Sequence, residues 1–313
     1  MTDDHKHPLI GLTCAVLGTV LFGAKAIVFK LALEAGAGVE QMMALRMGFS
    51  FPIFLFVGIW SLRSRPIRPK PLMLLLAGGL GIMTYHIGTW LDFQSLRFIS
   101  AQLERLILFT YPAIVAVLAW MVFGDRMTWR HAGALIFSYV GVIILFGREL
   151  SHAGHDVIIG SLFVFGAAVL MAINVTLAKS AIGALGSALF TSMAMGCAAL
   201  TILVHSAATA SAGHMPAFTP DIIMLGVVLA IVCTVLPSFL LSEGIARLGP
   251  GPASAIGNAG PVATAILAVF LLNEAFGWPH AAALVLTSIG ISLLGTGKKK
   301  KTPSPSGQVI KNV

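Results

Sequence analysis

Two lysines stand in an apolar stretch near the start of the chain. The stretch LFGAKAIVFKLA, residues 21–32, is otherwise built from apolar and small residues. Inside a bilayer an ionised lysine costs about 2.5–3.5 kcal/mol on insertion scales, so it needs water or a counter-charge beside it. Lys25 lies near such a depth, and we expect it to serve a solute or ion pathway. Lys30 lies nearer the helix end, where it can extend to the interface and pair with Glu34 one turn later.

Further polar and aromatic side chains stand in apolar stretches downstream. Arginine and lysine can bind anionic groups, whereas tyrosine and tryptophan offer stacking surfaces and hydrogen bonds. His86 and Glu104 are the best titratable candidates for proton coupling. Packing against neighbouring helices would explain Glu104 and Arg105 equally well. The candidate substrate-binding residues are Lys25, Arg46, Tyr85, His86, Trp90, Glu104, Arg105, Tyr111, Asn174 and Asn258.

The elements that must position these residues are membrane helices. Of the 313 residues, 57% are hydrophobic and 10% are charged, against roughly a quarter charged in soluble domains. Apolar runs of about 20 residues, long enough to cross a bilayer as helices and too long for barrel strands, recur along the chain. The predicted spans are about 10–33, 41–62, 71–91, 100–123, 129–147, 157–180, 184–206, 220–245, 250–272 and 278–296. The sequence therefore predicts an all-α membrane protein with ten transmembrane helices.

Several classes of protein are disfavoured. The HExxH, GxSxG and P-loop patterns are absent, so we expect neither an enzyme nor a cofactor. Cys14, Cys197 and Cys233 lie in apolar runs without CxxC spacing, which indicates buried small residues rather than metal ligands or disulfides. The net charge of +8 could suggest nucleic acid as a partner. Because most basic residues fall in connections on one side of the predicted spans, we expect a membrane-orientation signal instead.

The chain repeats itself with an offset of 149 residues. Matching pairs include Lys30 and Lys179, Pro112 and Pro261, Trp129 and Trp278, and His131 and His280. Each half holds five predicted spans, and an odd number makes the second half enter the bilayer from the opposite side. We therefore expect two inverted five-helix repeats, residues 9–147 and 157–296, followed by a disordered basic tail at 297–313.

Charge within the spans is concentrated in the first repeat. The residues repeat-related to Arg46, Glu104 and Arg105 are Met195, Ala253 and Ser254, and Asn174 matches Lys25. With a cytoplasmic N-terminus, the charged residues lie in the outer half of the first repeat. We expect an outward-facing polar vestibule with a basic excess, suited to a small anionic or zwitterionic solute.

Two long stretches resemble a known family. Residues 100–145 and their copy at 253–294 each carry a proline within the span (Pro112, Pro261), an acidic residue at the helix end (Asp125, Glu274), a tryptophan and a final helix with glycine. In this they resemble the paired EamA domains of the drug/metabolite transporter superfamily, and the likeness covers roughly residues 9–296. The resemblance implies a ten-helix carrier with cytoplasmic termini and a central solute cavity. Lys25 departs from the neutral residues that are commoner at its position, so the resemblance does not specify a substrate.

Together these features predict a secondary transporter that moves a small polar metabolite, such as an amino acid, by alternating access. We expect it in the bacterial cytoplasmic (inner) membrane with both termini in the cytoplasm, with a small-molecule solute and the lipid bilayer as its partners. A passive facilitator or exchanger, and a non-transporting intramembrane scaffold or sensor, are the alternatives. The solute, the direction of transport, the coupling ion and the oligomeric state are not determined by the sequence.

Overall fold

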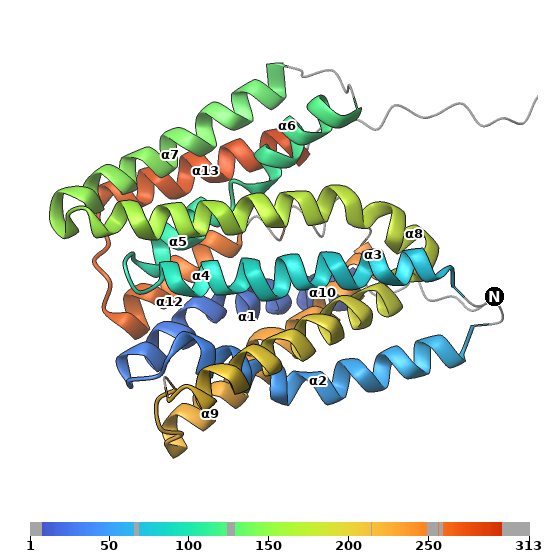
Figure 1. Cartoon of the computed structure of the whole chain (residues 1–313). Helices are drawn as coiled ribbons and strands as arrows, with labels where there is room; N and C mark the ends of the chain where they lie inside the picture. The colour runs from blue at the N-terminus through green and yellow to red at the C-terminus, as the bar shows by residue number, and fades with distance from the viewer. Residues whose placement is uncertain are drawn as a thin grey trace, which may run out of the picture.

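The fold is built from helices throughout the described part of the chain (Figure 1). The structure is a computed structural model and describes residues 8–65, 69–123, 129–213, 215–248, 256 and 259–295. Within these residues, seven helical stretches are long and apolar enough to cross a membrane. The remaining three predicted spans correspond to the helices Trp129–Ala153 and Trp278–Gly295 and to a shorter apolar helix of 13 residues, Gly260–Leu272. The expectation of an all-α membrane protein is confirmed.

Several of the predicted spans consist of more than one helical segment. The first half contains α1 (Pro8–Glu34), α2 (Val39–Arg63), α3 (Pro71–Gly81), the π-helix η1 (Ile82–Gly88), α4 (Thr89–Ser95), α5 (Ala101–Leu108), α6 (Tyr111–Phe123) and α7 (Trp129–Ala153). The second half contains α8 (Asp156–Ser211), α9 (Pro220–Ala230), the π-helix η2 (Ile231–Val235), α10 (Leu236–Leu248), α12 (Gly260–Leu272) and α13 (Trp278–Gly295). α8 holds two predicted spans, which meet at Gly186, where φ is 70°. Only glycine adopts this conformation readily, so it separates the two spans.

The duplication seen in the sequence recurs in the helix boundaries. Four elements of the first half begin 149 positions before a counterpart in the second, which is the offset of the sequence repeat. The pairs are α3 and α9, η1 and η2, α6 and α12, and α7 and α13. The two π-helical segments matter most for function, because such segments occur frequently at functional sites. Each interrupts the third span of its repeat.

Packing places α1 at the centre of the helices that carry the candidate residues. α1 contacts α10, α12 and α9, while α8 lies along α2 and α3. α7 and α13 pack against each other at one side of the molecule, as Figure 1 shows. In the largest apolar cluster the rings of Phe29 on α1 and Phe93 on α4 stack with their centroids 3.8 Å apart. The residue before Phe93 is Asp92, so this core lies directly beside buried charge.

Small residues allow α3 to approach α8 closely. A Cβ atom added at Gly78 would lie 3.0 Å from Cys197 Sγ, and one added at Gly81 would collide with the backbone of Ala194. A Cβ atom at Gly79 would meet nothing within 4 Å. Without a strong hydrophobic drive between helices in lipid, close packing of this kind holds membrane helices together.

This contact predicts opposite outcomes for two neighbouring glycines. Gly81→Ala should lower the free energy of unfolding by about 1–3 kcal/mol, because the new methyl group pushes α3 away from α8. Gly79→Ala adds the same methyl group to open space and should leave stability unchanged or slightly higher. Thermal unfolding of both variants in the same detergent measures the difference. Equal stability of the two variants would contradict the packing described here.

Candidate functional site

A buried ion pair joins α1 to α4. Lys25 Nζ lies 2.5 Å from Asp92 Oδ2, and both side chains are more than 90% buried. The ammonium group also lies over the rings of Phe22 and Phe93, with its nitrogen 5.9 and 5.5 Å from their centroids. Such cation–π contacts add attraction where water is excluded. Of the two expected ways to accommodate Lys25, water or a counter-charge, the structure shows a counter-charge, which Asp92 supplies.

Arg105 on α5 is tied to α1 and α12. Its guanidinium group donates to the carbonyl oxygens of Phe22 and Gly23, at 3.2 and 3.3 Å, and to Thr264 Oγ1 at 3.2 Å. The hydroxyl of Thr264 donates in turn to the carbonyl of Gly23 at 3.0 Å. This explains the glycine, because a Cβ atom at position 23 would lie 3.0 Å from the Thr264 hydroxyl. Arg105 therefore fixes the middle of α1 against two neighbouring helices.

The carboxyl group of Glu104, the residue before Arg105, contacts the carboxyl group of Asp92. Its side chain is fully buried, and no nitrogen or hydroxyl donor of the described residues gives a hydrogen bond to either of its oxygens. A hydrogen bond between the two carboxyl groups needs a proton on one of them, and Glu104 also interacts electrostatically with Arg105 and Lys25. A buried carboxyl group without a donor is unfavourable unless a ligand, a proton or an ordered water satisfies it.

Arg46 on α2 lies between the two π-helical segments. Its Nε donates to Thr234 Oγ1 of η2 at 2.9 Å, and its guanidinium carbon lies 5.8 Å from the centroid of the Phe93 ring. It also interacts electrostatically with Asp92 and with Tyr85 of η1. Its Nη1 is buried without a hydrogen-bond partner among the described residues. Tyr85 and Thr234 are repeat-related positions, so both halves contribute to the surroundings of this arginine.

Five buried charged side chains from four helices form what we call the charged cluster. Its members are Lys25 on α1, Arg46 on α2, Asp92 on α4, and Glu104 and Arg105 on α5. Three cations face two carboxyl groups in this cluster. The unsatisfied polar atoms of the cluster are Arg46 Nη1, Asp92 Oδ1 and both carboxyl oxygens of Glu104. Arg46 Nη1 can donate a hydrogen bond to an anionic group, and the carboxyl oxygens can accept one from a cationic group.

Four of the predicted binding residues thus belong to the cluster, and one of its members was missing from the predicted set. That member is Asp92, which lies at the end of the third predicted span. The signal that could have identified it is the lysine itself, because a cation buried at that depth needs an acid on a facing helix. Sequence spacing cannot say which acid faces it, since 67 residues separate Lys25 from Asp92.

Other predicted residues border the cluster or lie apart from it. Tyr85 is partly buried and packs against the core next to Arg46. The Tyr111 ring lies edge-on to Phe109, which in turn lies under the guanidinium group of Arg105. Asn174 is buried on α8, and its Oδ1 has no hydrogen-bond partner within the described residues. Asn258 lies outside the described residues.

His86 and Trp90 have partners of their own. His86 Nδ1 lies 3.0 Å from Thr201 Oγ1, and its Nε2 lies 3.2 Å from His205 Nδ1, both on α8. Trp90 Nε1 donates to Glu40 Oε1 on α2 at 2.9 Å. The contacts of these two residues therefore lie with α8 and α2 rather than with the charged cluster.

The predicted partner of Lys30 is wrong. Lys30 Nζ lies 3.0 Å from Glu274 Oε1, in the chain that follows α12, and also donates to the carbonyl of Ile99 at 3.1 Å. Glu34 does not accept it, although the i,i+4 spacing is favourable. The side chain of Lys30 is 22% exposed and points across to the other repeat. Lys30 thus pairs with Glu274, which is distant in the sequence, instead of the nearby Glu34.

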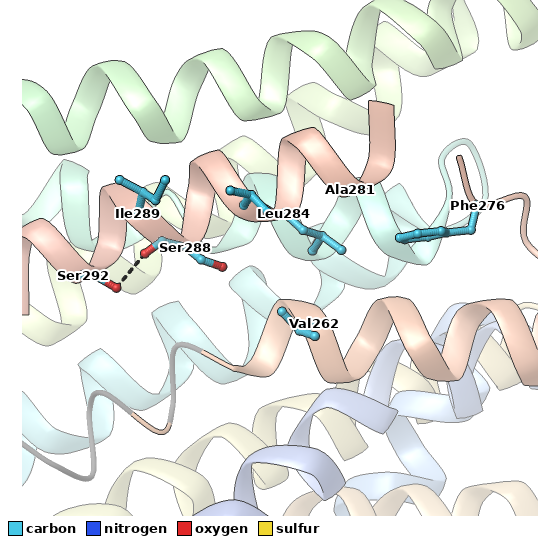
Figure 2. Close-up of a pocket in the computed structure, with 8 residues that line it drawn as sticks. Val262, Phe276, Ala281, Leu284, Ser288, Ile289 and Ser292 are labelled. Atoms are coloured by element: carbon cyan, nitrogen blue, oxygen red, sulfur yellow. Dashed lines mark hydrogen bonds between the residues drawn. The ribbon is translucent and has the colours of Figure 1, made fainter. Parts of the chain in front are cut away.

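A crevice of about 610 Å³ between α12 and α13 is not part of the charged cluster. Figure 2 shows Val262 on α12 and Leu284 on α13 at its border, with Ser288 further along α13. Its lining is apolar apart from serines and contains none of the predicted binding residues. An apolar crevice of this kind does not suit a charged solute.

Comparison with known proteins identifies the family. A sequence model described as the EamA-like transporter family matches residues 9–147 and again 158–296. The chain belongs to the EamA-like transporter family. Two Bacillus subtilis (strain 168) proteins are similar to this EamA-like chain over most of its length. The uncharacterized transporter YcbK is 26% identical over 94% of this chain and 97% of its own, and the uncharacterized transporter YcxC is 24% identical over 93% and 94%.

Similarity in structure supports the fold of this EamA-like transporter. One solved crystal structure matches with a TM-score of 0.60 over 91% of this chain and 95% of its own, at 18% sequence identity. At that identity the match shows the fold alone. The family and the apolar helices make the protein an integral membrane transporter for a small-molecule solute.

The buried ion pair predicts a non-additive effect on stability. Asp92→Asn leaves the Lys25 charge buried without a counter-charge and should lower the free energy of unfolding by about 3–5 kcal/mol. The double variant Lys25→Met with Asp92→Leu removes both charges and should lose much less. Thermal unfolding of the purified protein in detergent compares the two. A double variant as unstable as Asp92→Asn would contradict the prediction.

Proposed function

We propose that this EamA-like transporter is a secondary carrier that moves a small anionic or zwitterionic metabolite, such as an amino acid, by alternating access. The observation that carries the proposal is the charged cluster with its unsatisfied polar atoms. The free donor of Arg46 would bind a solute carboxylate, because charge-assisted hydrogen bonds are about twice as strong as neutral ones. The free oxygens of Glu104 and Asp92 would accept hydrogen bonds from a solute ammonium group.

The repeat supports the mechanism. Helix boundaries recur with the offset of the sequence repeat, and inverted repeats of similar shape allow one central site to open to either side in turn. We propose that the two five-helix repeats are inverted, with both termini cytoplasmic and the chain in the bacterial cytoplasmic membrane. The end of α1 and the starts of α2 and α5 then lie at the outer face. The excess of Lys and Arg in the other connections favours this orientation.

The alternatives make different predictions in one experiment. The purified protein is reconstituted in proteoliposomes, and each member of a panel of amino acids and organic acids is tested for counterflow. A carrier gives saturable uptake that is accelerated by unlabelled solute on the opposite side. Uptake that neither saturates nor counterflows would favour a passive facilitator, and no uptake of any panel member by folded protein would favour a scaffold or sensor.

Loss of the free guanidinium donor should abolish most of this counterflow. Arg46→Gln is expected to lower the transport rate at subsaturating solute at least tenfold, which corresponds to about 1.4 kcal/mol of lost binding. The matched control is Glu243→Gln, because Glu243 pairs with Arg247 one turn away on the same helix and its side chain is 48% exposed. The control should stay within about twofold of the unmodified protein. Near-normal counterflow in Arg46→Gln would remove this arginine from the solute site.

Proton coupling through Glu104 is a second part of the proposal. Its carboxyl group is buried against that of Asp92 and receives no hydrogen bond from a nitrogen or hydroxyl donor of the described residues, so a proton shared by the two carboxyl groups would lower the repulsion between them. A solute ammonium group binding at the same oxygens would compete with that proton. Such competition is one physical basis for exchanging a proton against a solute.

If Glu104 couples transport to protons, substituting it should affect uptake driven by a pH gradient more than solute exchange. Glu104→Gln should keep counterflow but lose the acceleration that an imposed pH gradient gives to the unmodified protein, because glutamine carries no exchangeable charge. His86→Gln should keep the response, since His86 contacts Thr201 and His205 instead of the cluster. The reverse pattern, with the response lost only in His86→Gln, would assign coupling to the histidine pair.

A further inference from the structure

The carboxylate of Glu274, in the second repeat, accepts hydrogen bonds from two helices of the first repeat. Its Oε1 accepts from Lys30 Nζ at 3.0 Å and from the backbone N–H of Ala101 at 2.8 Å. Its Oε2 accepts from the side-chain amide of Gln102 at 3.2 Å and, more weakly, from the Gln102 backbone N–H at 3.4 Å. The side chain is 11% exposed. One acidic group of the second repeat thus holds α1 and the start of α5 in the first.

The backbone before Glu274 directs it toward α5. α12 ends at Asn273, whose φ of 52° is the only positive value at a non-glycine position within the described residues. Asparagine is tolerated in this left-handed conformation, which commonly ends a helix. The chain then turns back, and the N–H of Glu274 donates to the carbonyl of Ala268 at 3.2 Å. This sharp turn brings Glu274 to the first turn of α5.

The same two helices carry three of the five residues of the charged cluster. Ala101, Gln102 and Glu104 lie in the first turn of α5, and Arg105 follows Glu104 directly. Lys30 lies five positions after Lys25 on α1. A movement that separates Glu274 from these donors would therefore act on α1 and α5 together. The cluster and the contacts of Glu274 are mechanically connected through short helical segments.

We propose that Lys30, Glu274 and the amides of Ala101 and Gln102 form a latch that closes the charged cluster toward the face where α1 ends. The latch rests on the proposed function, since a carrier with one central site must close each face in turn. Opening this face requires Glu274 to leave its donors on the first repeat. Solute or proton binding at Glu104, in the same first turn of α5, is placed to favour or oppose that step.

A native cysteine allows the latch to be tested without knowing the solute. Cys233 of η2 is fully buried and interacts electrostatically with Arg46, Lys25 and Arg105. In a Cys14→Ser, Cys197→Ala background it becomes the sole thiol. Its rate of modification by a negatively charged, membrane-impermeant methanethiosulfonate then reports access to the cluster. The rate is measured in right-side-out and inside-out membrane vesicles.

Weakening the latch should open one face only. In right-side-out vesicles, Glu274→Gln and Lys30→Met should each raise the modification rate of Cys233 roughly tenfold, as expected for one lost charge-assisted hydrogen bond. Neither variant should raise the rate in inside-out vesicles. The matched comparison is Glu149→Gln, because Glu149 on α7 binds the start of α5 through Ser100 and interacts with Lys30 and Glu274 only electrostatically. It should change the rate less than twofold.

Each other result of the Cys233 modification experiment either supports or overturns the latch. Unchanged Cys233 modification in both latch variants would overturn the latch while leaving the counterflow test of the proposed function intact. An equal rise in both vesicle orientations would indicate a loosened fold and also overturn it. An equal rise in Glu149→Gln would show that any weakening of the α5 start suffices, which excludes a specific contact between repeats. A rise confined to inside-out vesicles would support the latch and overturn the proposed orientation.

Discussion

The arrangement of this transporter depends on the cost of burying charge away from water. An isolated lysine in a low-dielectric interior is strongly unfavourable, and its attraction to a nearby carboxylate compensates only when the geometry is close. The contact of 2.5 Å between Lys25 and Asp92 meets this condition. It fixes the relative height of α1 and α4, and it places Phe93 beneath both Lys25 and Arg46. The other members of the charged cluster lie around this ion pair.

The remaining polar contacts differ in how completely they are satisfied. Arg105 donates to two carbonyl oxygens and a hydroxyl group, so it acts as a structural tie between α5, α1 and α12. Arg46 and Glu104 instead leave polar atoms without partners. Since native proteins satisfy most buried polar groups, the unsatisfied ones mark where a solute or proton is expected to bind. The neighbouring residues Glu104 and Arg105 therefore differ in role. Arg105 holds the helices together, while the carboxyl group of Glu104 is available to a solute or a proton.

Much of the fold could be predicted from the sequence because hydropathy and repetition are local or periodic signals. The apolar runs located the helices, and the offset of 149 residues reappeared in the starts of α3 and α9 and of α6 and α12. The interruptions by η1 and η2 were not predicted, because a π-helical turn differs from an α-helical one by a small change in hydrogen bonding that leaves no clear pattern in composition. Small residues allow helices to approach closely, but the structure alone identifies Ala194 as the neighbour of Gly81.

The amino-acid sequence alone predicts that charged residues lie within apolar spans, that they gather in the first repeat, and that Lys25 needs water or a counter-charge beside it. The identity of each charged partner follows only from the folded arrangement of the helices. Lys25 meets Asp92 from 67 residues away, and Lys30 meets Glu274 from 244 residues away instead of the nearby Glu34. The reason is physical: pairing depends on the rotation and height of each helix against its neighbours. Those quantities are set by the packing of all helices together, whereas local spacing reports only which residues share one face of one helix.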